Sequence, residues 1–370
     1  MIRAADRPRA AADLRILVVD GGAGTIRVAG AAELPELFAP GDLLVVNDAA
    51  TFPASLAGIT PRGEPIELRV AGAIVAEALR ATVALLGPGD HRTLTEDRPP
   101  PPPVAPGDRI RLAGGLVATV AALDPSTPRL AEVVFGLDRP GATAGVWAAL
   151  YRAGRPVQYA HVPEPLALWD VQNVYAGRPW SVEMPSAGRA IRGETLLALA
   201  RRGVEVARVT HAAGLSSIGD AAIDAVLPLP ERFEVEGATW EAVARARRVG
   251  GRVVAIGTSA ARALEGAARA GRRTGITDHL LGPGTRRAIV DAVLTGVHET
   301  GTSHFDLLRA FAPREVLDAA LARAEAESLL GHEHGDLWLV WGAPRRRADV
   351  GPGAAARGPF SASSPGAPAR

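Results

Sequence analysis

The chain has 370 residues, of which 47% are hydrophobic and 22% charged, proportions that are typical of a folded globular protein and exclude a wholly disordered or collagen-like chain. The absence of cysteine excludes disulfides, thiolate catalysis and cysteine-based metal sites. All 41 basic residues are arginine, which also excludes Schiff-base chemistry and a Walker lysine, and the formal net charge is only +1.

The N-terminal region predicts the beginning of a mixed α/β unit. Residues 14–19 form an apolar run that predicts a strand, and the glycine-rich turn at 21–24 leads to a second strand at 26–28. A dinucleotide-binding loop has to lead into a helix, so these glycines favour a hairpin over a nucleotide site. A short helix at 33–38 and an apolar run at 43–46 follow.

Residues 56–138 have a different pattern, because apolar residues alternate with polar ones in short segments separated by turns. This period of two predicts an all-β insert. Five consecutive prolines at 99–103 interrupt it. They are either an exposed loop between strands, the commoner case, or a polyproline ligand for a partner.

Beyond residue 143 predicted helices alternate with apolar strands, which indicates an α/β layer or barrel. Helices are expected at 194–202, 240–248, 260–270 and 313–330. Strands are expected at 204–209, 252–256, 289–294 and 337–341.

The C-terminal segment 344–370 lacks periodicity and predicts a disordered tail. From residue 345 on it carries five arginines and one aspartate, so the rest of the chain has a net charge of −3 and an RNA partner would have to be held by a local arginine patch. No segment resembles a signal peptide or a membrane span, so we expect a cytoplasmic protein without a membrane partner.

Two predicted helix beginnings carry hydroxyl residues directly after a strand or loop. They are Gly257, Thr258 and Ser259, and Thr302 and Ser303. Hydroxyls at an N-cap leave free backbone N–H groups and the positive end of the helix dipole facing a ligand, which suits a carboxylate or a phosphate. An ordinary capped helix is the alternative explanation.

Acid–base candidates lie in the same half of the chain. His298 follows a predicted strand, Asp278 precedes a rigid Gly-Pro-Gly turn, and Glu231 follows a proline-rich bend. Each is compatible with a surface or structural role as well. The cluster at 332–334, His-Glu-His, suggests a metal, but without cysteine or an evident further ligand we expect no metal there.

Six segments in a fixed order carry a family resemblance that spans about residue 14 to residue 341. They read GDLLVVNDAATFPASL, VQNVYAGRPWSVEMPSAGRAI, VTHAAGLSSIG, RVVAIGTSAARALE, TDHLLGPG and IVDAVLTGVHETGTSHFDLLRAFA. Together they resemble the S-adenosylmethionine:tRNA ribosyltransferase-isomerase family of queuosine biosynthesis. Several segments in register are far more specific than any one of them.

The resemblance implies a fold and a reaction. The fold is α/β, a distorted barrel-like main domain made from residues 1–55 and 143–343, with a small antiparallel β-barrel inserted at 56–142. The reaction moves and isomerises the ribosyl part of S-adenosylmethionine onto 7-aminomethyl-7-deazaguanine in tRNA, giving epoxyqueuosine and releasing adenine and methionine. S-adenosylmethionine and tRNA would be its partners, and we expect a monomer.

The resemblance also implies roles for individual residues. Acid–base work would fall to His298, Asp278 or Glu231. S-adenosylmethionine would be held by Gly257, Thr258, Ser259, Thr302 and Ser303. The base pocket would be lined by Asn47, Gln172, Pro185, Ser186, Ala187, Gly188 and Arg262.

The sequence departs from the family pattern at several positions. Arginines of the family are replaced by Ala50 and Ser55, and histidines by Ala190 and Leu229. Each lost cation is expected to reduce the salt dependence of RNA binding by about one unit. Two alternatives therefore stay open: a ribosyltransferase of the same fold with another acceptor, and a non-catalytic nucleoside- or RNA-binding paralogue.

Overall fold

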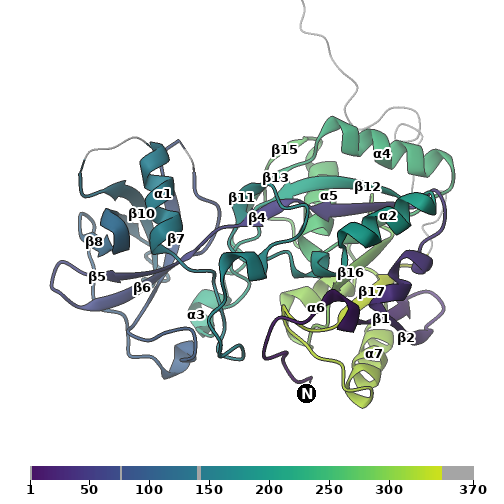
Figure 1. Cartoon of the computed structure of the whole chain (residues 1–370), viewed down its shortest axis with the longest axis horizontal. Coiled ribbons are helices and arrows are strands. Elements are labelled where there is room, and N and C mark those ends of the chain that lie inside the picture. The colour runs from purple at the N-terminus through teal and green to yellow at the C-terminus, as the bar shows by residue number, and fades with distance from the viewer. Residues whose placement is uncertain (1, 76, 140–142, 344–370) are drawn as a thin grey trace, which may run out of the picture.

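The computed structural model describes residues 2–75, 77–139 and 143–343. Figure 1 shows two bodies beside one another, a small β-barrel at one end of the long axis and a large helix-covered sheet at the other. The predicted disordered tail, 344–370, lies outside the described residues.

The small body is a closed antiparallel barrel whose strands follow the order β10-β7-β6-β5-β8-β9. Its strands are β5 (Ser55–Ile59), β6 (Pro65–Val70), β7 (Arg80–Leu86), β8 (Arg109–Leu112), β9 (Leu116–Leu123) and β10 (Leu130–Leu137). The predicted all-β insert is confirmed, and its proline run lies in the loop between the turn η3 (Thr95–Asp97) and β8.

Helix α1 (Thr143–Ala153) packs with this barrel and not with the large sheet. Its buried residues Val146, Ala149 and Leu150 belong to the same apolar core as the barrel strands. The expected domain boundary at residue 142/143 therefore precedes a helix that packs against the barrel, and the division into domains stays a prediction.

The large sheet combines both ends of the chain in the order β15-β13-β12-β3-β14-β16-β17-β1-β2, so β15 and β2 form its edges. Its strands are β1 (Arg15–Asp20), β2 (Ile26–Gly30), β3 (Leu43–Asn47), β12 (Glu205–His211), β13 (Glu231–Glu234), β14 (Val253–Ile256), β15 (Thr274–Thr277), β16 (Ala292–Gly296) and β17 (Leu337–Trp341). The mixed α/β fold with an inserted antiparallel barrel is confirmed.

Helices cover both faces of this sheet, as the alternation within β3 shows. Leu43 and Val45 belong to one apolar core, and Leu44 and Val46 to the other. The first core includes residues of α4 (Gly237–Arg248), α5 (Thr258–Ala270), α6 (Ser303–Leu308) and α7 (Arg314–Ala326). The second includes residues of η2 (Ala31–Leu37), η6 (Ser186–Ala190) and α2 (Gly193–Arg201). Central strands buried on both faces are expected to be continuously apolar, as these are.

Smaller elements complete the chain. A two-stranded sheet joins β4 (Ala49–Thr51) to β11 (Arg178–Ser181), and short helical segments are η1 (Ala11–Asp13), η4 (Ala113–Gly115), η5 (Leu168–Val171) and α3 (Ala221–Asp224).

Some predicted boundaries were wrong. β16 begins at Ala292 instead of residue 289, and α7 ends at Ala326, short of the expected residue 330. Helix α6 ends at Leu308, so Phe311 joins the core from beyond the helix.

The glycine-rich turn after β1 closes a hairpin, as predicted. β1 pairs antiparallel with β2, and the Asp20 carboxylate accepts hydrogen bonds from the backbone N–H groups of Gly22 (2.9 Å) and Ala23 (2.8 Å). The turn thus satisfies its own N–H groups with a side chain from the preceding strand.

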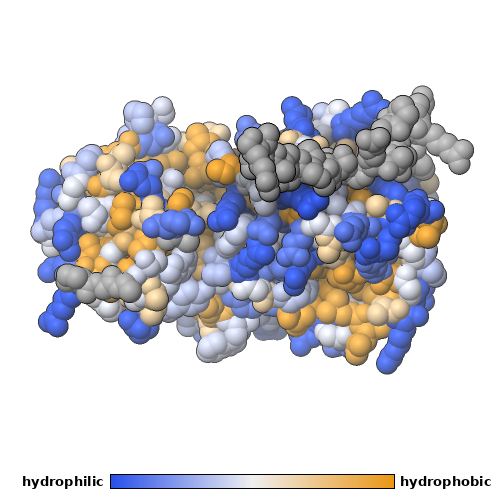
Figure 2. Space-filling view, turned by 90° about the horizontal axis from the view of Figure 1, so that it is seen from above, coloured by the Kyte–Doolittle hydropathy of each residue, from blue (hydrophilic) through white to orange (hydrophobic). Residues whose placement is uncertain are grey.

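The surface in Figure 2 carries hydrophilic side chains between smaller apolar patches, one of them at the end that holds the barrel. Within the described ranges, no helix is both long enough and apolar enough to cross a membrane.

Candidate functional site

The parallel strands in the middle of the large sheet all have their carboxyl ends along the same side of the sheet. A polar residue lies at the end of each strand or directly after it. β12, β3, β14 and β16 are parallel neighbours. Their carboxyl ends present His211, Asn47, the segment from Gly257 to Ser259, and the loop with His298. Ligands of open α/β sheets bind at this kind of edge.

The antiparallel strands of the same sheet bring further groups to this edge. β13 begins there with Glu231, because His211 at the end of β12 pairs with Phe233. β17 begins there after the segment 332–336, because Gly296 at the end of β16 pairs with Leu337. We call this set of strand ends the carboxyl edge.

Asn47 connects three of these segments through its side chain. Its Oδ1 accepts from the backbone N–H groups of His211 (2.9 Å) and Ala49 (3.1 Å). Its Nδ2 donates to the carbonyl of His211 (3.0 Å) and to Oγ of Ser259 (3.2 Å). The amide is therefore saturated by the protein, so Asn47 positions its neighbours instead of lining a pocket with free groups.

Glu231, Arg262 and His211 form a buried cluster next to this amide. The guanidinium of Arg262 pairs with Oε2 of Glu231, which also lies 3.3 Å from Nε2 of His211, and Glu231 Oε1 accepts from the Gly214 N–H (2.8 Å). Burial raises the pKa of Glu231 despite the Arg262 charge, while burial and that charge hold the pKa of His211 well below its usual range. At neutral pH the imidazole is therefore neutral.

This cluster holds polar atoms that the protein leaves unsatisfied. Arg262 is 8% exposed, yet its Nη2 has no hydrogen-bond partner in the described part of the chain, and neither ring nitrogen of His211 has one. Buried polar groups are nearly always paired, so these donors and acceptors are free for a partner from outside the chain, whether an ordered water or a ligand.

The beginning of α5 differs from the prediction that hydroxyls cap it. The N-cap is Gly257, with φ of 94°, and no side chain caps the helix there. Thr258 and Ser259 lie in the first turn, and the Ser259 hydroxyl is held by Asn47. A Cβ placed on Gly257 would lie 3.9 Å from Ala187, which brings the predicted base-pocket segment against this helix beginning.

His298 lies in a group of imidazoles after β16. Its Nε2 lies 2.7 Å from Oγ1 of Thr295, and its ring stacks on that of His304 with centroids 4.7 Å apart. Burial and the neighbouring imidazoles His304 and His332 hold the pKa of His298 well below its usual range, and burial and the Arg262 charge lower the pKa of His304 to about 4.

The second predicted helix beginning uses its hydroxyl within its own loop. Thr302 Oγ1 donates to the carbonyl of Glu299 (2.8 Å) and accepts from the Phe305 N–H (3.2 Å). Thr302 caps α6, as predicted, but both it and Ser303 are exposed. Their proposed contact with S-adenosylmethionine stays a prediction.

Asp278 lies at the other end of the carboxyl edge from His298. β15 and β16 are five positions apart in the strand order of the sheet. Asp278 is exposed and lines a pocket of about 430 Å³ together with Arg269 and His279. No hydrogen bond or ion pair joins the Asp278 side chain to another candidate among the described residues, but Thr277 pairs with Glu231 and the His279 carbonyl accepts from Arg262 Nε (3.4 Å).

The predicted base-pocket segment is held against β4. The amide of Gln172 accepts from the Thr51 N–H (3.1 Å) and donates to its carbonyl (2.6 Å), while Asn173 Nδ2 donates to the carbonyl of Pro185 (2.9 Å). A Cβ on Gly188 would overlap the Tyr175 hydroxyl. The segment with Pro185, Ser186, Ala187 and Gly188 is thus fixed in place.

Sequence reasoning missed functional candidates at this edge. His211 could have been found, since it directly follows the apolar run of its strand. His161 could not, because it belongs to an irregular segment 172 residues away from Glu333, with which its Nε2 is hydrogen bonded (3.2 Å). The expectation that the segment 332–334 has no further candidate ligand was therefore wrong.

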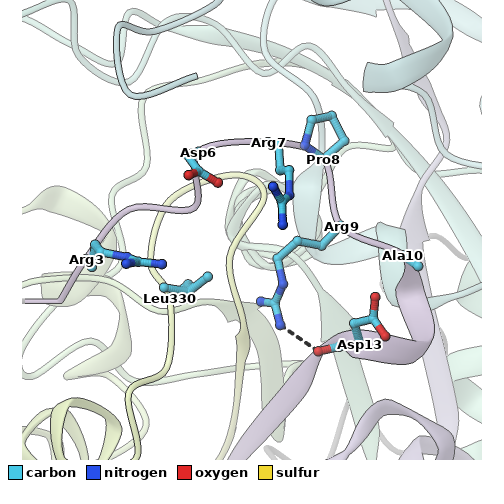
Figure 3. A pocket seen from close by; sticks show the side chains of 8 residues that line it. All are labelled: Arg3, Asp6, Arg7, Pro8, Arg9, Ala10, Asp13 and Leu330. Carbon is cyan, nitrogen blue, oxygen red and sulfur yellow. Dashed lines mark hydrogen bonds between the residues drawn. The ribbon is translucent and has the colours of Figure 1, made fainter. Parts of the chain in front are cut away.

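An arginine-lined pocket of about 260 Å³ lies beside the same edge. Figure 3 shows Arg3 and Arg7 of the N-terminal segment around it, with Arg9 donating to the carbonyl of Asp13 (2.6 Å). Arg9 also pairs with Asp336 (2.8 Å), just before β17. Arg3 and Arg7 are exposed and make no ion pair with any described residue.

The sequence is similar to those of known proteins. Residues 2–340 match the family model described as queuosine biosynthesis protein. The S-adenosylmethionine:tRNA ribosyltransferase-isomerase of Acidithiobacillus ferrooxidans is 35% identical over 88% of this chain and 90% of its own length. That of Anaeromyxobacter dehalogenans is 34% identical over 90% and 93%. A crystal structure of an S-adenosylmethionine tRNA ribosyltransferase from Thermotoga maritima aligns with 91% of this chain and 95% of its own, with 20% identity and a TM-score of 0.49.

Proposed function

The chain belongs to the family of queuosine biosynthesis proteins, and from this premise we propose that it is an S-adenosylmethionine:tRNA ribosyltransferase-isomerase. It would transfer and isomerise the ribosyl moiety of S-adenosylmethionine onto 7-aminomethyl-7-deazaguanine in tRNA, forming epoxyqueuosine and releasing adenine and methionine.

The observation that carries this proposal is the set of unsatisfied buried groups at the carboxyl edge. Arg262, Glu231 and His211 form one contact cluster, in which Glu231 is paired with both neighbours while Arg262 Nη2 and His211 Nδ1 have no partner among the described residues. Leaving such groups unpaired costs about 1–3 kcal/mol each, a cost that a bound substrate removes. A polar nucleoside supplies the acceptors and donors that these side chains need.

His298 and Glu231 are the residues best placed to transfer protons in this reaction. The sulfonium makes the neighbouring C5′ protons acidic, so a modest base within hydrogen-bond reach is sufficient. When Nε2–H of His298 donates to Thr295 Oγ1, Nδ1 is the ring nitrogen that accepts a proton, and the lowered pKa keeps that imidazole neutral at pH 7. The raised pKa of Glu231 lets this carboxyl hold a proton closer to neutrality than an exposed one.

The beginning of α5 suits the carboxylate end of S-adenosylmethionine. Backbone N–H groups of Thr258 and Ser259 lie in the first turn of a 13-residue helix, where the dipole favours an anion. Arg262 lies one turn further along the same helix and offers its unpaired Nη2 to an oxygen of the substrate. The base would then lie toward Ala187 and Gly188.

The arginine-lined pocket suits a tRNA phosphate. Its exposed Arg3 and Arg7 have no described ion-pair partner, and phosphate contacts of this kind fix the register of an RNA without reading its sequence.

The test is a reaction with doubly labelled S-adenosylmethionine and tRNA that carries 7-aminomethyl-7-deazaguanine. We expect adenine and methionine to be released in equal amounts, with the tRNA gaining the mass of the ribosyl group. Tight binding of S-adenosylmethionine without adenine release, on this or any other tRNA, would contradict the proposal. tRNA with guanine at the same position is the matched control and should give no release.

A further inference from the structure

Two histidines and a glutamate from distant parts of the chain lie close together. One histidine belongs to the irregular segment between α1 and η5, and the other two residues belong to the segment before β17. Their possible ligand atoms, one each from His161, His332 and Glu333, all lie within 4.8 Å of one another. None of the three has a role in the proposed ribosyl transfer, so the cluster needs an explanation of its own.

The distances are short enough for the three side chains to share one metal ion after small side-chain rotations. Nε2 of His161 lies 3.2 Å from Oε1 of Glu333, and the rings of His161 and His332 have centroids 4.4 Å apart. Ligands bound at 2.0–2.1 Å in a tetrahedral site are themselves separated by ~3.3 Å. A hydrogen bond between His161 and Glu333 explains one of these contacts; the second imidazole, His332, is exposed, makes no ring hydrogen bond among the described residues and is free to bind an ion.

The backbone around His161 is fixed by a buried amide. Nε2 of Gln158 donates to the carbonyls of Val162 (2.7 Å) and Glu164 (2.6 Å), and so closes the loop around the histidine. The ring of Tyr159 lies nearly parallel to that of His161, at an angle of 6°. A ligand held in this way loses little freedom when it binds an ion.

The opposite side of the cluster is equally fixed. His332 has a φ of 65°, a conformation rare for a residue with a side chain, and its carbonyl accepts from the Gly335 N–H (3.0 Å). Arg189 donates to the carbonyl of Glu333 (3.3 Å). Strain of this kind is retained where the surroundings impose it, and it collects at functional sites.

The residue that directly follows Glu333 in the chain is also a histidine. His334 is fully buried, and neither of its ring nitrogens has a hydrogen-bond partner in the part of the chain that the structure describes. A buried imidazole without a partner is costly, so a polar species beside Glu333 that the chain itself does not supply would satisfy it.

We propose that His161, His332 and Glu333 form a binding site for a divalent transition-metal ion, of which Zn²⁺ is the best chemical match. Two imidazoles and one carboxylate suit Zn²⁺ and its neighbours in the first transition row and do not suit Mg²⁺ or Ca²⁺. A water molecule completes the coordination and lies within reach of the region around His334. The ion joins the segment around His161 to the segment before β17, which closes the carboxyl edge on one side.

The experiment measures Zn²⁺ binding by the untagged, chelator-treated full chain through competition with a chromophoric chelator, with Co²⁺ absorption as a reporter of ligand geometry. We expect one equivalent to bind with a Kd of about 1 μM or tighter and an intense Co²⁺ spectrum typical of four-coordinate sites. Thermal stability of the wild type should rise with added Zn²⁺.

Two variants remove ligands with little disturbance of the fold. His332→Asn keeps a residue type that tolerates positive φ, and Glu333→Gln keeps the size of the side chain. Each should weaken Zn²⁺ binding at least about 100-fold, since even the loss of an outer-shell partner costs 10–100-fold.

The matched control is His91→Gln, which removes a half-buried imidazole that is hydrogen bonded to the Pro163 carbonyl (3.0 Å), and it should bind Zn²⁺ like the wild type. Zn²⁺ binding that is unchanged in both ligand variants overturns the proposal, as does the lack of a stoichiometric site. The measurement needs neither S-adenosylmethionine nor tRNA, so it stands or fails separately from the proposed reaction.

Discussion

The small barrel and the carboxyl edge of the large sheet both bury charged side chains, but they treat them differently. In the barrel, Glu67 pairs with Arg69 (2.7 Å) and Arg98 and accepts from the Ser55 hydroxyl (2.9 Å). No barrel side chain among the described residues has a buried polar atom without a partner. At the carboxyl edge, Arg262, His211 and others do.

Buried charges whose partners are all within the protein stabilise the fold, whereas buried charges without a full set of partners are available to bind a ligand. A saturated buried pair contributes to a unique structure, and removing one partner is costly because the other stays buried. An unsaturated group lowers stability in the free protein and is compensated when a ligand binds. The contrast predicts that matched substitutions in the two regions affect different measurements.

The largest effect is expected for Arg262→Met, which keeps the packing of the aliphatic stem and removes the guanidinium. The value of kcat/KM for tRNA modification should fall about 1000-fold, or about 4 kcal/mol, because the variant loses a buried donor and the partner of Glu231. Steady-state kinetics measure it. A decrease below about tenfold would place the substrate away from this cluster.

The counterpart in the barrel is Arg98→Met, which removes a cation from Glu67. The free energy of unfolding should fall by about 3 kcal/mol, since Glu67 keeps only Arg69. Urea denaturation measures this, and the turnover of the folded fraction should stay within about twofold of the wild type. A large loss of kcat without a loss of stability would mean that the two regions do not differ as argued.

His298→Ala tests the base at the carboxyl edge and should lower kcat about 100-fold. Because the pKa of His298 lies well below its usual range, the wild-type rate should be constant from about pH 6.5 to 8 and fall only in acid. His91→Gln serves as the control. An unchanged rate in the variant would move the role to Glu231 or Asp278.

The buried carboxyls of Glu183 and Glu67 should change the free energy of unfolding with pH in opposite directions. Burial raises the pKa of Glu183 to about 7, although Tyr159 and Ser216 donate to it, whereas Arg69 and Arg98 lower the pKa of Glu67 despite its burial. Folded Glu183 keeps its proton at pH values where the unfolded chain has lost it. Its contribution to stability is therefore complete below about pH 4.5 and is lost as the pH rises toward 7, by about 3 kcal/mol.

Denaturant unfolding at several pH values measures this effect. Glu183→Gln should remove the decline between pH 5 and 7, while Glu67 should produce the reverse dependence, a loss of stability below about pH 4.5. Equal slopes in wild type and Glu183→Gln would show that Glu183 ionises normally.

The smallest effect concerns exposed arginines. The double variant Arg3→Ala, Arg7→Ala should raise the Kd for tRNA a few-fold and reduce the salt dependence of binding by about one to two units. The exposed barrel residues Arg62 and Arg111 provide the matched double variant, which should leave both quantities unchanged. Identical salt slopes for the two double variants would remove the pocket from the tRNA interface.

The barrel and most helices could be predicted from the sequence because their periodicity is local. Strand β8 alternates arginine with apolar residues at each of its positions, and α5 is a short alanine-rich helix. The segment after β14 was also identified, since a glycine between an apolar strand and a helix is a local signal.

The arrangement of the site could be predicted only in part. That His298 lies at this edge follows from its place after a strand, but the positions of Glu231, at the beginning of an antiparallel strand, and of Asp278 depend on the strand order, which no local pattern reveals. The contact between His161 and Glu333 joins an irregular segment to a loop 172 residues away. Whether a buried charge is saturated, as at Glu67, or unsaturated, as at Arg262, depends on such tertiary contacts.

The most direct test is a crystal structure of this protein with bound S-adenosylmethionine. Density for the nucleoside should lie at the ends of β3, β14 and β16, with an oxygen of the ligand within 3.2 Å of Arg262 Nη2, a normal hydrogen-bond distance. Density against the barrel, or at the opposite edge of the large sheet, would contradict the site described for this enzyme.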